Sequence, residues 1–132
     1  MIMATLFIQL AEYSDRLAKY ESDVFQDVFA PEIIKYVEEQ YQTATLEELA
    51  NEMNVALSTA SKIVKKSTGM TFKELLKNQR LIRAANLLEH TNMSITDIIA
   101  RVGYDNTSYF HRIFREAYQM SPKEYRSWKI RT

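Results

Sequence analysis

Several features that would indicate other classes of protein are absent or scarce in this chain. It has no cysteine, so disulfide frameworks and thiolate metal sites are excluded. Only two glycines and two prolines occur among 132 residues, which favours helices joined by short turns. No apolar run approaches the roughly 18 residues of a membrane span, and residues 1–13 lack the features of a signal peptide. We therefore expect a cytoplasmic protein without a membrane segment.

The net charge is also zero, but the charges are unevenly distributed. Residues 1–54 hold three Lys or Arg and eleven Asp or Glu, a net charge of −8. Residues 55–132 hold fourteen basic and six acidic residues, a net charge of +8. A polyanion would therefore meet the second part of the chain. Charges that only coat solvent-facing helices would give the same totals, so charge alone leaves both interpretations open.

Start and stop signals predict helices along the whole chain, and no segment alternates with the period of a strand. Four hydroxyl-then-acid pairs have the spacing of a helix-starting capping box: Thr45 with Glu48, Thr71 with Glu74, Ser94 with Asp97 and Ser121 with Glu124. Gly69 and Gly103 stand where helices should close. The fold class is therefore all-α, with helices expected at residues 4–28, 31–41, 46–53, 58–67, 71–89, 95–102, 107–117 and 122–130.

The helical segments contain an internal repeat. Residues 45–75 match residues 94–125 at an offset of 49 before the turn and 50 after it, so the second copy has one extra residue in its turn. A solenoid needs about three stacked units. Two small modules joined by the helix at 71–89 therefore fit the sequence better.

In each copy, apolar residues predict a core between two short helices. For the second copy this core comprises Ile95, Ile98, Ile99, Val102, Tyr109, Phe110, Ile113, Phe114 and Ala117. For the first it comprises Leu46, Leu49, Ala50, Met53, Val55, Ala60, Ile63 and Val64. The joining helix should bury Phe72, Leu75, Leu76, Ile82, Ala85 and Leu88. Two such helices across a short turn, the second polar and basic outside, describe a helix-turn-helix, and two of these need successive major-groove segments about 34 Å apart.

Three groups of motifs resemble one known family. They are Val102-Gly103-Tyr104 with Ser108-Tyr109-Phe110 and Ser121-Pro122-x-x-Tyr125-Arg126; Leu81-x-x-Ala84-x-x-Leu87-Leu88; and Lys65-Lys66-x-x-Gly69-Met70-Thr71-Phe72. Over about residues 31–130 the chain resembles the AraC/XylS transcription regulators. The resemblance implies a bipartite DNA-binding domain at 31–132, and the N-terminal helix expected within residues 1–30 precedes it. That domain would have a first helix-turn-helix at 31–70, a linker helix at 71–89 and a second helix-turn-helix at 90–132.

The resemblance also implies roles for individual residues. Base reading is expected from Ser58, Ser61 and Lys62 in the first copy, and from Thr107, Ser108, His111 and Arg112 in the second. Arg112 is the leading candidate for a bidentate contact to guanine. Phosphate contacts are expected from Lys65, Lys66, Arg101, Arg115 and Lys123. Double-stranded DNA is the expected partner, and RNA polymerase is a second candidate.

The sequence gives little support for catalysis. His90 and His111 are isolated, and no acidic cluster has metal-ligand spacing. No glycine-rich loop is present that would hold a phosphate. We therefore expect neither an enzyme nor a bound cofactor or metal.

The chain departs from the family pattern mainly in the first copy. Ala60 and Val64 stand where the family usually has Leu and Phe, and the outward residues Ser58 and Ser61 are short. Gln119 replaces a common glycine in the second copy, which bears on the geometry of that turn. We therefore expect a thinner core and weaker base reading in the first copy, and a dominant reader in the second.

Residues 1–30 lie outside the resemblance and carry a heptad pattern. The candidate seam residues are Leu6, Leu10, Tyr13, Leu17, Tyr20 and Val24. This helix would either pair two chains, resembling the dimerising helix of longer family members, or pack on its own DNA-binding domain. In the first case the chain would be the C-terminal part of a longer, effector-responsive protein. The alternative function is a protein-interaction helical bundle that has lost base reading.

Overall fold

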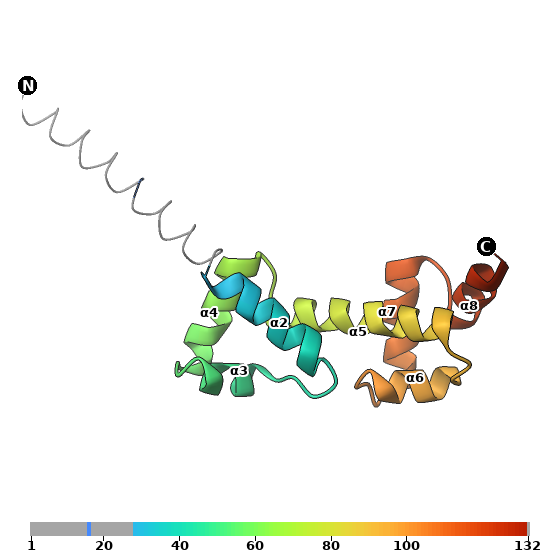
Figure 1. Cartoon of the computed structure of the whole chain (residues 1–132), viewed down its shortest axis with the longest axis horizontal. Helices are drawn as coiled ribbons and strands as arrows, with labels where there is room; N and C mark the ends of the chain where they lie inside the picture. Colours follow the sequence, from blue (N-terminus) through green and yellow to red (C-terminus); the bar gives the residue numbers. More distant parts are fainter. Residues whose placement is uncertain (1–15, 17–27, 132) are drawn as a thin grey trace, which may run out of the picture. The chain divides into compact units, whose positions relative to one another are not determined.

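The computed structural model describes residue 16 and residues 28–131, and every regular element in these residues is helical (Figure 1). The predicted limits differ from the observed ones by no more than one residue, so the all-α prediction is confirmed. The predicted helix at 4–28 and its heptad residues lie outside the described residues. The helices are α2 (Ala30–Gln40), α3 (Leu46–Glu52), α4 (Leu57–Thr68), α5 (Phe72–His90), α6 (Ile95–Arg101), α7 (Thr107–Tyr118) and α8 (Pro122–Arg131).

The helix starts in the second copy are fixed by side-chain caps. Side-chain oxygens of Ser94, Asn106 and Ser121 each accept a hydrogen bond from the backbone N–H three residues later, at 3.0–3.1 Å. Such a cap satisfies one of the free N–H groups of the first turn and stabilises a helix by about 1 kcal/mol. The short helices α6, α7 and α8 therefore begin where local chemistry dictates.

Among the residues that the structure describes, four have a left-handed backbone, and they occupy matching positions in the two copies. Asn54 (φ 55°) and Gly103 (φ 102°) lie in the turns within the helix-turn-helix pairs, 49 residues apart. Gly69 (φ 77°) and Gln119 (φ 62°) close α4 and α7, 50 residues apart. Gln119 thus keeps the geometry that glycine would give, although this conformation costs an L-residue roughly 1–2 kcal/mol.

The described helices group into two compact units. Of the described residues, the first unit comprises residues 16, 28–35 and 46–72, and the second comprises residues 36–45 and 73–131. Helix α2 is therefore divided, its last residues and the turn after it belonging with α5 to α8. The sequence did not indicate this grouping, since it read residues 31–70 as one continuous module.

The core of the first unit lies between α3 and α4. Leu49 and Ala50 on α3 and Ile63 on α4 are buried as predicted. Ala60 and Val64, the two positions with unusually small side chains, are completely buried. The small side chains of Ala60 and Val64 are therefore shielded from solvent by their neighbours.

The second unit has an aromatic core. Phe110 and Phe114 on α7 are completely buried, with ring centroids 5.7 Å apart. Phe114 stacks on Tyr118 at 4.6 Å and meets the edge of Tyr125 at 5.6 Å. Because α8 supplies Tyr125, this ring cluster joins α7 to the last helix. The other buried residues of this core cluster are Leu81, Ala84, Ala85, Leu88, Ile98, Ile99, Val102 and Ile113.

Two core predictions are wrong. Ile82 was expected to face inward but is 55% exposed, and its neighbour Leu81 takes the buried position. Helix α5 carries adjacent apolar pairs, so periodicity alone did not distinguish its buried face from its exposed one. Ala117 on α7 is exposed as well. A single methyl group costs little to expose, so alanine is a weak marker of a core face.

Two arginines hold helix ends within the second unit. Arg126 on α8 donates from Nε to the Leu88 carbonyl at 3.1 Å and from Nη2 to the Thr91 carbonyl at 3.3 Å. Arg80 on α5 donates from Nε to the Tyr41 carbonyl at 2.8 Å and from Nη2 to the Gln42 carbonyl at 3.3 Å. Arg126 thus satisfies carbonyls at the C-terminus of α5, and Arg80 satisfies carbonyls in the turn that follows α2.

Gly103 packs against the same segment that Arg80 binds. A Cβ at this glycine would lie 2.6 Å from the Gln42 carbonyl oxygen and 3.0 Å from the Arg80 guanidinium. Residues 41 and 42 are therefore hydrogen-bonded to an arginine on α5, and Gln42 also lies close to the glycine in the turn between α6 and α7.

A polar contact joins α8 to the end of α5. The Tyr125 hydroxyl donates a hydrogen bond to the Glu89 carboxylate, and Lys129 Nζ lies 3.7 Å from it. The hydrogen bond, assisted by Lys129 and His90, holds the pKa of Glu89 below its usual value against the opposing effect of burial. Burial and the hydrogen bond to Glu89 raise the pKa of Tyr125, so its hydroxyl stays a donor.

Candidate nucleic-acid interface

Helix α7 presents a polar and basic face in front of the aromatic core. Phe110, Ile113 and Phe114 bury one side of the helix. The four predicted base-reading residues of the second copy are exposed on the other side: Thr107, Ser108, His111 and Arg112. The buried side chains thus anchor α7 to the core of the second unit, and its exposed face is available to a partner.

Arg112 is oriented by a neighbouring ring. Its guanidinium carbon lies 5.3 Å from the centroid of the Tyr109 ring, one turn earlier on α7. The contact is a cation–π interaction, which restrains the side chain without using up its hydrogen-bond donors. An arginine held in this way can present two parallel N–H groups to the N7 and O6 acceptors of guanine.

His111 has one ring nitrogen fixed by its own helix. Nδ1 lies 2.8 Å from the Thr107 carbonyl oxygen, which can only accept. In the neutral ring, Nδ1 therefore carries the proton, and Nε2 is left as an acceptor. That form suits the amino groups of adenine or cytosine in the major groove, whereas the protonated ring would suit acceptors.

Helix α4 presents a different surface. Ser58, Ser61 and Lys62 are exposed, as predicted, opposite the buried Ile63 and Val64. A shallow groove along this helix is lined by Thr59, Ser61, Lys62, Ile63, Lys65, Lys66 and Thr71. The hydroxyls are short, so Lys62 is the only predicted base-reading residue of this copy with a long side chain.

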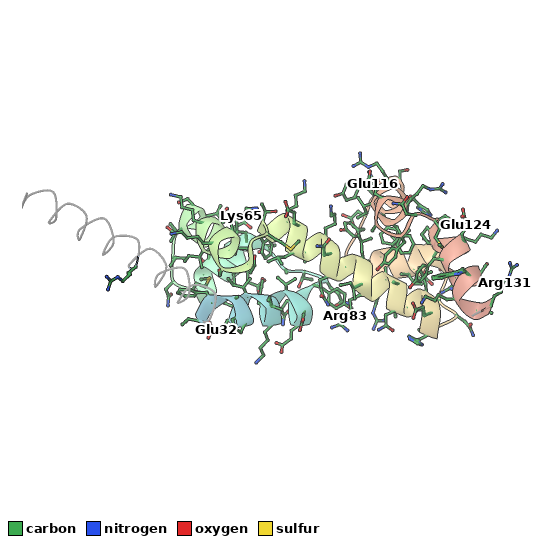
Figure 2. The ribbon with its side chains drawn as sticks, turned by 90° about the horizontal axis from the view of Figure 1, so that it is seen from above. Glu32, Lys65, Arg83, Glu116, Glu124 and Arg131 are labelled. Atoms are coloured by element: carbon green, nitrogen blue, oxygen red, sulfur yellow. The ribbon has the colours of Figure 1, made fainter. Side chains whose placement is uncertain are left out.

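All five predicted phosphate contacts are exposed, and the intramolecular contacts of Lys65 and Arg115 bear on their availability. Lys65, labelled in Figure 2, donates from Nζ to the Gly69 carbonyl at 3.1 Å and so helps to close α4. Arg115 lies 3.6 Å from Glu124, and both side chains are well exposed. A surface pair of this kind stabilises by at most about 1 kcal/mol, so it leaves Arg115 able to rearrange toward a phosphate. Lys66, Arg101 and Lys123 are the other three.

The sequence interpretation missed a pocket next to α7. A hollow of about 280 Å³ is lined by Lys73, Leu76, Lys77, Arg80, Tyr104 and Tyr109. The three cations follow an i, i+4, i+7 spacing on α5, which places them on one face of the helix. That spacing could have drawn attention to α5. The tyrosines come from the following helix-turn-helix, so only the fold brings the two groups together.

The described part of the chain holds no group of three or more His, Cys, Asp or Glu residues that could bind a metal ion. Among the same residues, no helix is long and apolar enough to cross a membrane.

Comparison with known proteins identifies the domain. A family model for a helix-turn-helix domain matches residues 49–127. The transcriptional activator RhaS of Citrobacter koseri is 29% identical over 122 residues, which cover 92% of this chain and 44% of that protein. The chain thus spans less than half the length of this relative.

Two solved structures are similar in both sequence and fold. The C-terminal domain of AraT, a response regulator from Geobacillus stearothermophilus, is 35% identical with a TM-score of 0.63 and covers 72% of this chain and 84% of that one. The C-terminal domain of the response regulator yesN from Fusobacterium nucleatum is 32% identical with a TM-score of 0.67. The match covers 74% of this chain and 97% of that one. Since the family match extends over more than half of its length, the chain belongs to the helix-turn-helix domain family, as a DNA-binding domain of the AraC/XylS type.

Proposed function

We propose that this chain regulates transcription by binding a specific double-stranded DNA sequence, with α4 and α7 as the two recognition helices. The main support is the outer face of α7, where Thr107, Ser108, His111 and Arg112 are exposed in front of a fully buried aromatic core. This set combines a bidentate cation, an imidazole and two hydroxyls, which together can read base edges in the major groove. The named relatives and structural neighbours are regulators, and none is described as an enzyme.

The two helices are proposed to contribute unequally. Helix α7 offers two long polar side chains, Arg112 and His111, whereas α4 offers Lys62 with two short serines. A hydroxyl can bond to several bases, while a bidentate arginine selects guanine. We therefore assign most of the sequence discrimination to α7, and mainly positioning on the duplex to α4.

Selection of bound duplexes from a random pool, followed by Arg112→Ala, tests this function. The pool should yield a preferred sequence. Arg112→Ala should reduce the preference for one base pair by about 1–3 kcal/mol, or roughly 5- to 150-fold. Arg115→Ala is the matched control, because it removes the same charge from the same helix and should weaken binding to all sequences about equally.

Two results would overturn the proposal. One is the absence of duplex binding at low salt, which would favour a protein-interaction bundle. The other is an unchanged sequence preference in Arg112→Ala, which would exclude α7 as the dominant reader.

Two further partners are part of the proposal. RNA polymerase is a partner that a regulator bound next to a promoter would meet in the bacterial cytoplasm, the proposed location. A second copy of the chain would pair through residues 1–30, whose heptad pattern needs a partner surface. The mass of the protein in solution, with and without Leu10→Asp and Leu17→Asp, tests the pairing. A monomer in the wild type, or an unchanged dimer in the variant, would contradict it.

A further inference from the structure

Helix α5 has a basic face that the two-reader arrangement does not use. Lys73, Lys77 and Arg80 line one side of the hollow described above, and Tyr104 and Tyr109 line the other. We call this hollow, defined by these five residues and Leu76, the α5 pocket. At about 280 Å³ it is below the 300–1,000 Å³ typical of sites for drug-sized ligands, so it suits a group rather than a whole effector.

The charge of the α5 pocket is positive and unopposed. None of its lining residues is acidic, and the carboxylates nearest in sequence, Glu74 and Asp105, do not line it. Within residues 28–131, no carboxylate forms an ion pair with Lys73 or Lys77. Three cations on one helix face repel each other, so an anion between them would relieve that repulsion.

Arg80 is fixed without being neutralised. Its Nε and Nη2 donate to the carbonyls of Tyr41 and Gln42, and its guanidinium carbon lies 5.0 Å from the centroid of the Tyr104 ring. All these partners are uncharged, so the side chain is held in place while its full positive charge faces the pocket. Fixed charges of this kind bind an anion with little loss of side-chain freedom.

The tyrosines complete the lining with a donor. Burial raises the pKa of Tyr104, partly opposed by the positive charge of Arg80. Its hydroxyl therefore stays protonated at neutral pH and can donate a hydrogen bond to an anionic oxygen. Tyr109 lies on α7, and the ring that lines the pocket also makes the cation–π contact with Arg112.

We propose that the α5 pocket binds one backbone phosphate of the duplex next to the groove that α7 enters. This inference rests on the proposed DNA binding and extends it, because it makes α5 a part of the DNA contact as well as a spacer between two readers. A phosphate matches the positive charge, the small volume and the hydroxyl donor. The backbone is favoured over a free anion because Tyr109, which lines the pocket, also contacts Arg112 on the exposed face of α7.

Neutralising the lysines tests the proposal in the full-length chain. Lys73→Gln and Lys77→Gln should together lower the affinity for the selected duplex and for a scrambled one by the same factor. Losing one phosphate contact should reduce the magnitude of the slope of log affinity against log salt by about 0.9. At about 0.1 M salt this corresponds to a roughly eightfold lower affinity than the wild type has. Lys35→Gln, in an exposed lysine of α2, is the matched control. Lysine and glutamine have similar helix propensities, so folding should be unaffected and circular dichroism can check it.

Replacing single phosphates by uncharged methylphosphonates should identify the linkage. One substituted linkage should weaken binding of the wild type but not of the double lysine variant. If the double variant has the affinity and salt slope of Lys35→Gln while the wild type still selects a sequence, this proposal fails and the proposed function stands. If the wild type binds no duplex, both fail.

Titration with inorganic phosphate separates the two sources of this group. In the DNA-free chain we expect no saturable change in the nuclear magnetic resonance signals of Tyr104 and Tyr109 at millimolar phosphate. A saturable change that requires Lys77, together with unchanged duplex binding in the variants, would assign the pocket to a free anion and overturn the backbone assignment.

Discussion

A single methyl group added at Gly103 should destabilise the second unit severely. This glycine combines a left-handed backbone with close contact to another segment, since a Cβ would lie 2.6 Å from the Gln42 carbonyl oxygen. Gly69 supplies an internal reference. It is also left-handed, at φ 77°, but a Cβ there would meet no atom within 4 Å. Comparing alanine at the two positions therefore separates backbone strain from loss of space.

The size of each effect can be worked out separately. A left-handed L-residue costs roughly 1–2 kcal/mol, of which about 0.4–1 kcal/mol is recovered because alanine restricts the unfolded chain more than glycine does. Gly69→Ala should thus lower the free energy of unfolding by about 1 kcal/mol. At Gly103 the Gln42 carbonyl, which also accepts from Arg80, must move as well. Overpacking of this kind typically adds about 1–3 kcal/mol, so Gly103→Ala should cost about 2–4 kcal/mol.

Urea unfolding of the full chain measures both variants. Trp128 is the single tryptophan, and its ring centroid lies 6.0 Å from that of Tyr125, so its fluorescence follows the second unit. Circular dichroism follows all the helices. For each variant, the shift of the urea midpoint from the wild type is compared at equal slopes of the unfolding curves. The reasoning would be refuted if the shift caused by Gly103→Ala, followed by fluorescence, were no larger than the shift caused by Gly69→Ala, followed by circular dichroism. In that case the approach of residues 41 and 42 to the turn would contribute nothing to stability.

Two other predictions concern the second unit. The hydrogen bond from Tyr125 is the main cause of the lowered pKa of Glu89. Glu89 should therefore stabilise the fold at pH values above its pKa in the unfolded chain, near 4.5. This stabilisation should be lost as the pH falls through the lower pKa of the folded state. Glu89→Gln and Tyr125→Phe should each remove this part of the acid dependence when unfolding is followed from pH 7 to pH 3, and wild-type slopes in both variants would count against the assignment. Gln119→Gly should raise the free energy of unfolding by about 0.5–1 kcal/mol because it relieves left-handed strain, although it gives up the exposed bond from Gln119 Nε2 to the Glu116 carbonyl at 3.0 Å. Gly69→Gln, the reverse change in the other copy, should lower it, and equal signs for the two changes would disprove the equivalence of the two positions.

The helix limits could be predicted from the sequence because local chemistry determines them. Ser94 and Ser121 accept the capping hydrogen bonds that their spacing implied, and Gly69 closes α4 as expected. Such signals act over three or four residues, so no knowledge of the tertiary fold is needed.

The buried face of α5 shows where periodicity stops being informative. Spacing alone selected Ile82, whereas the motif that carries the family resemblance contains Leu81, Ala84 and Leu88, which are the residues found buried. A helix with adjacent apolar pairs fits two neighbouring faces equally well, and only the elements packed against it determine which face is covered.

The candidate site was predictable in part. The outward residues of α4 and α7 are exposed as expected, although their roles stay predictions until binding is measured. The α5 pocket was missed because its cations and its tyrosines are more than twenty residues apart in the sequence. Arg80 was missed for a related reason, since its hydrogen-bond partners Tyr41 and Gln42 precede the whole first copy.

Residues 36–45 pack with the second unit although they precede the first copy of the repeat, and this affects how the chain folds during synthesis. Gln42 leaves the ribosome 61 residues before Gly103, about 3–12 s earlier at typical rates of synthesis. Helices α3 and α4 can pair within that interval, whereas residues 36–45 must wait for a partner that is not yet made. The two copies of the repeat are therefore not two independent folding units. The second copy completes itself around a segment that was synthesised before the first.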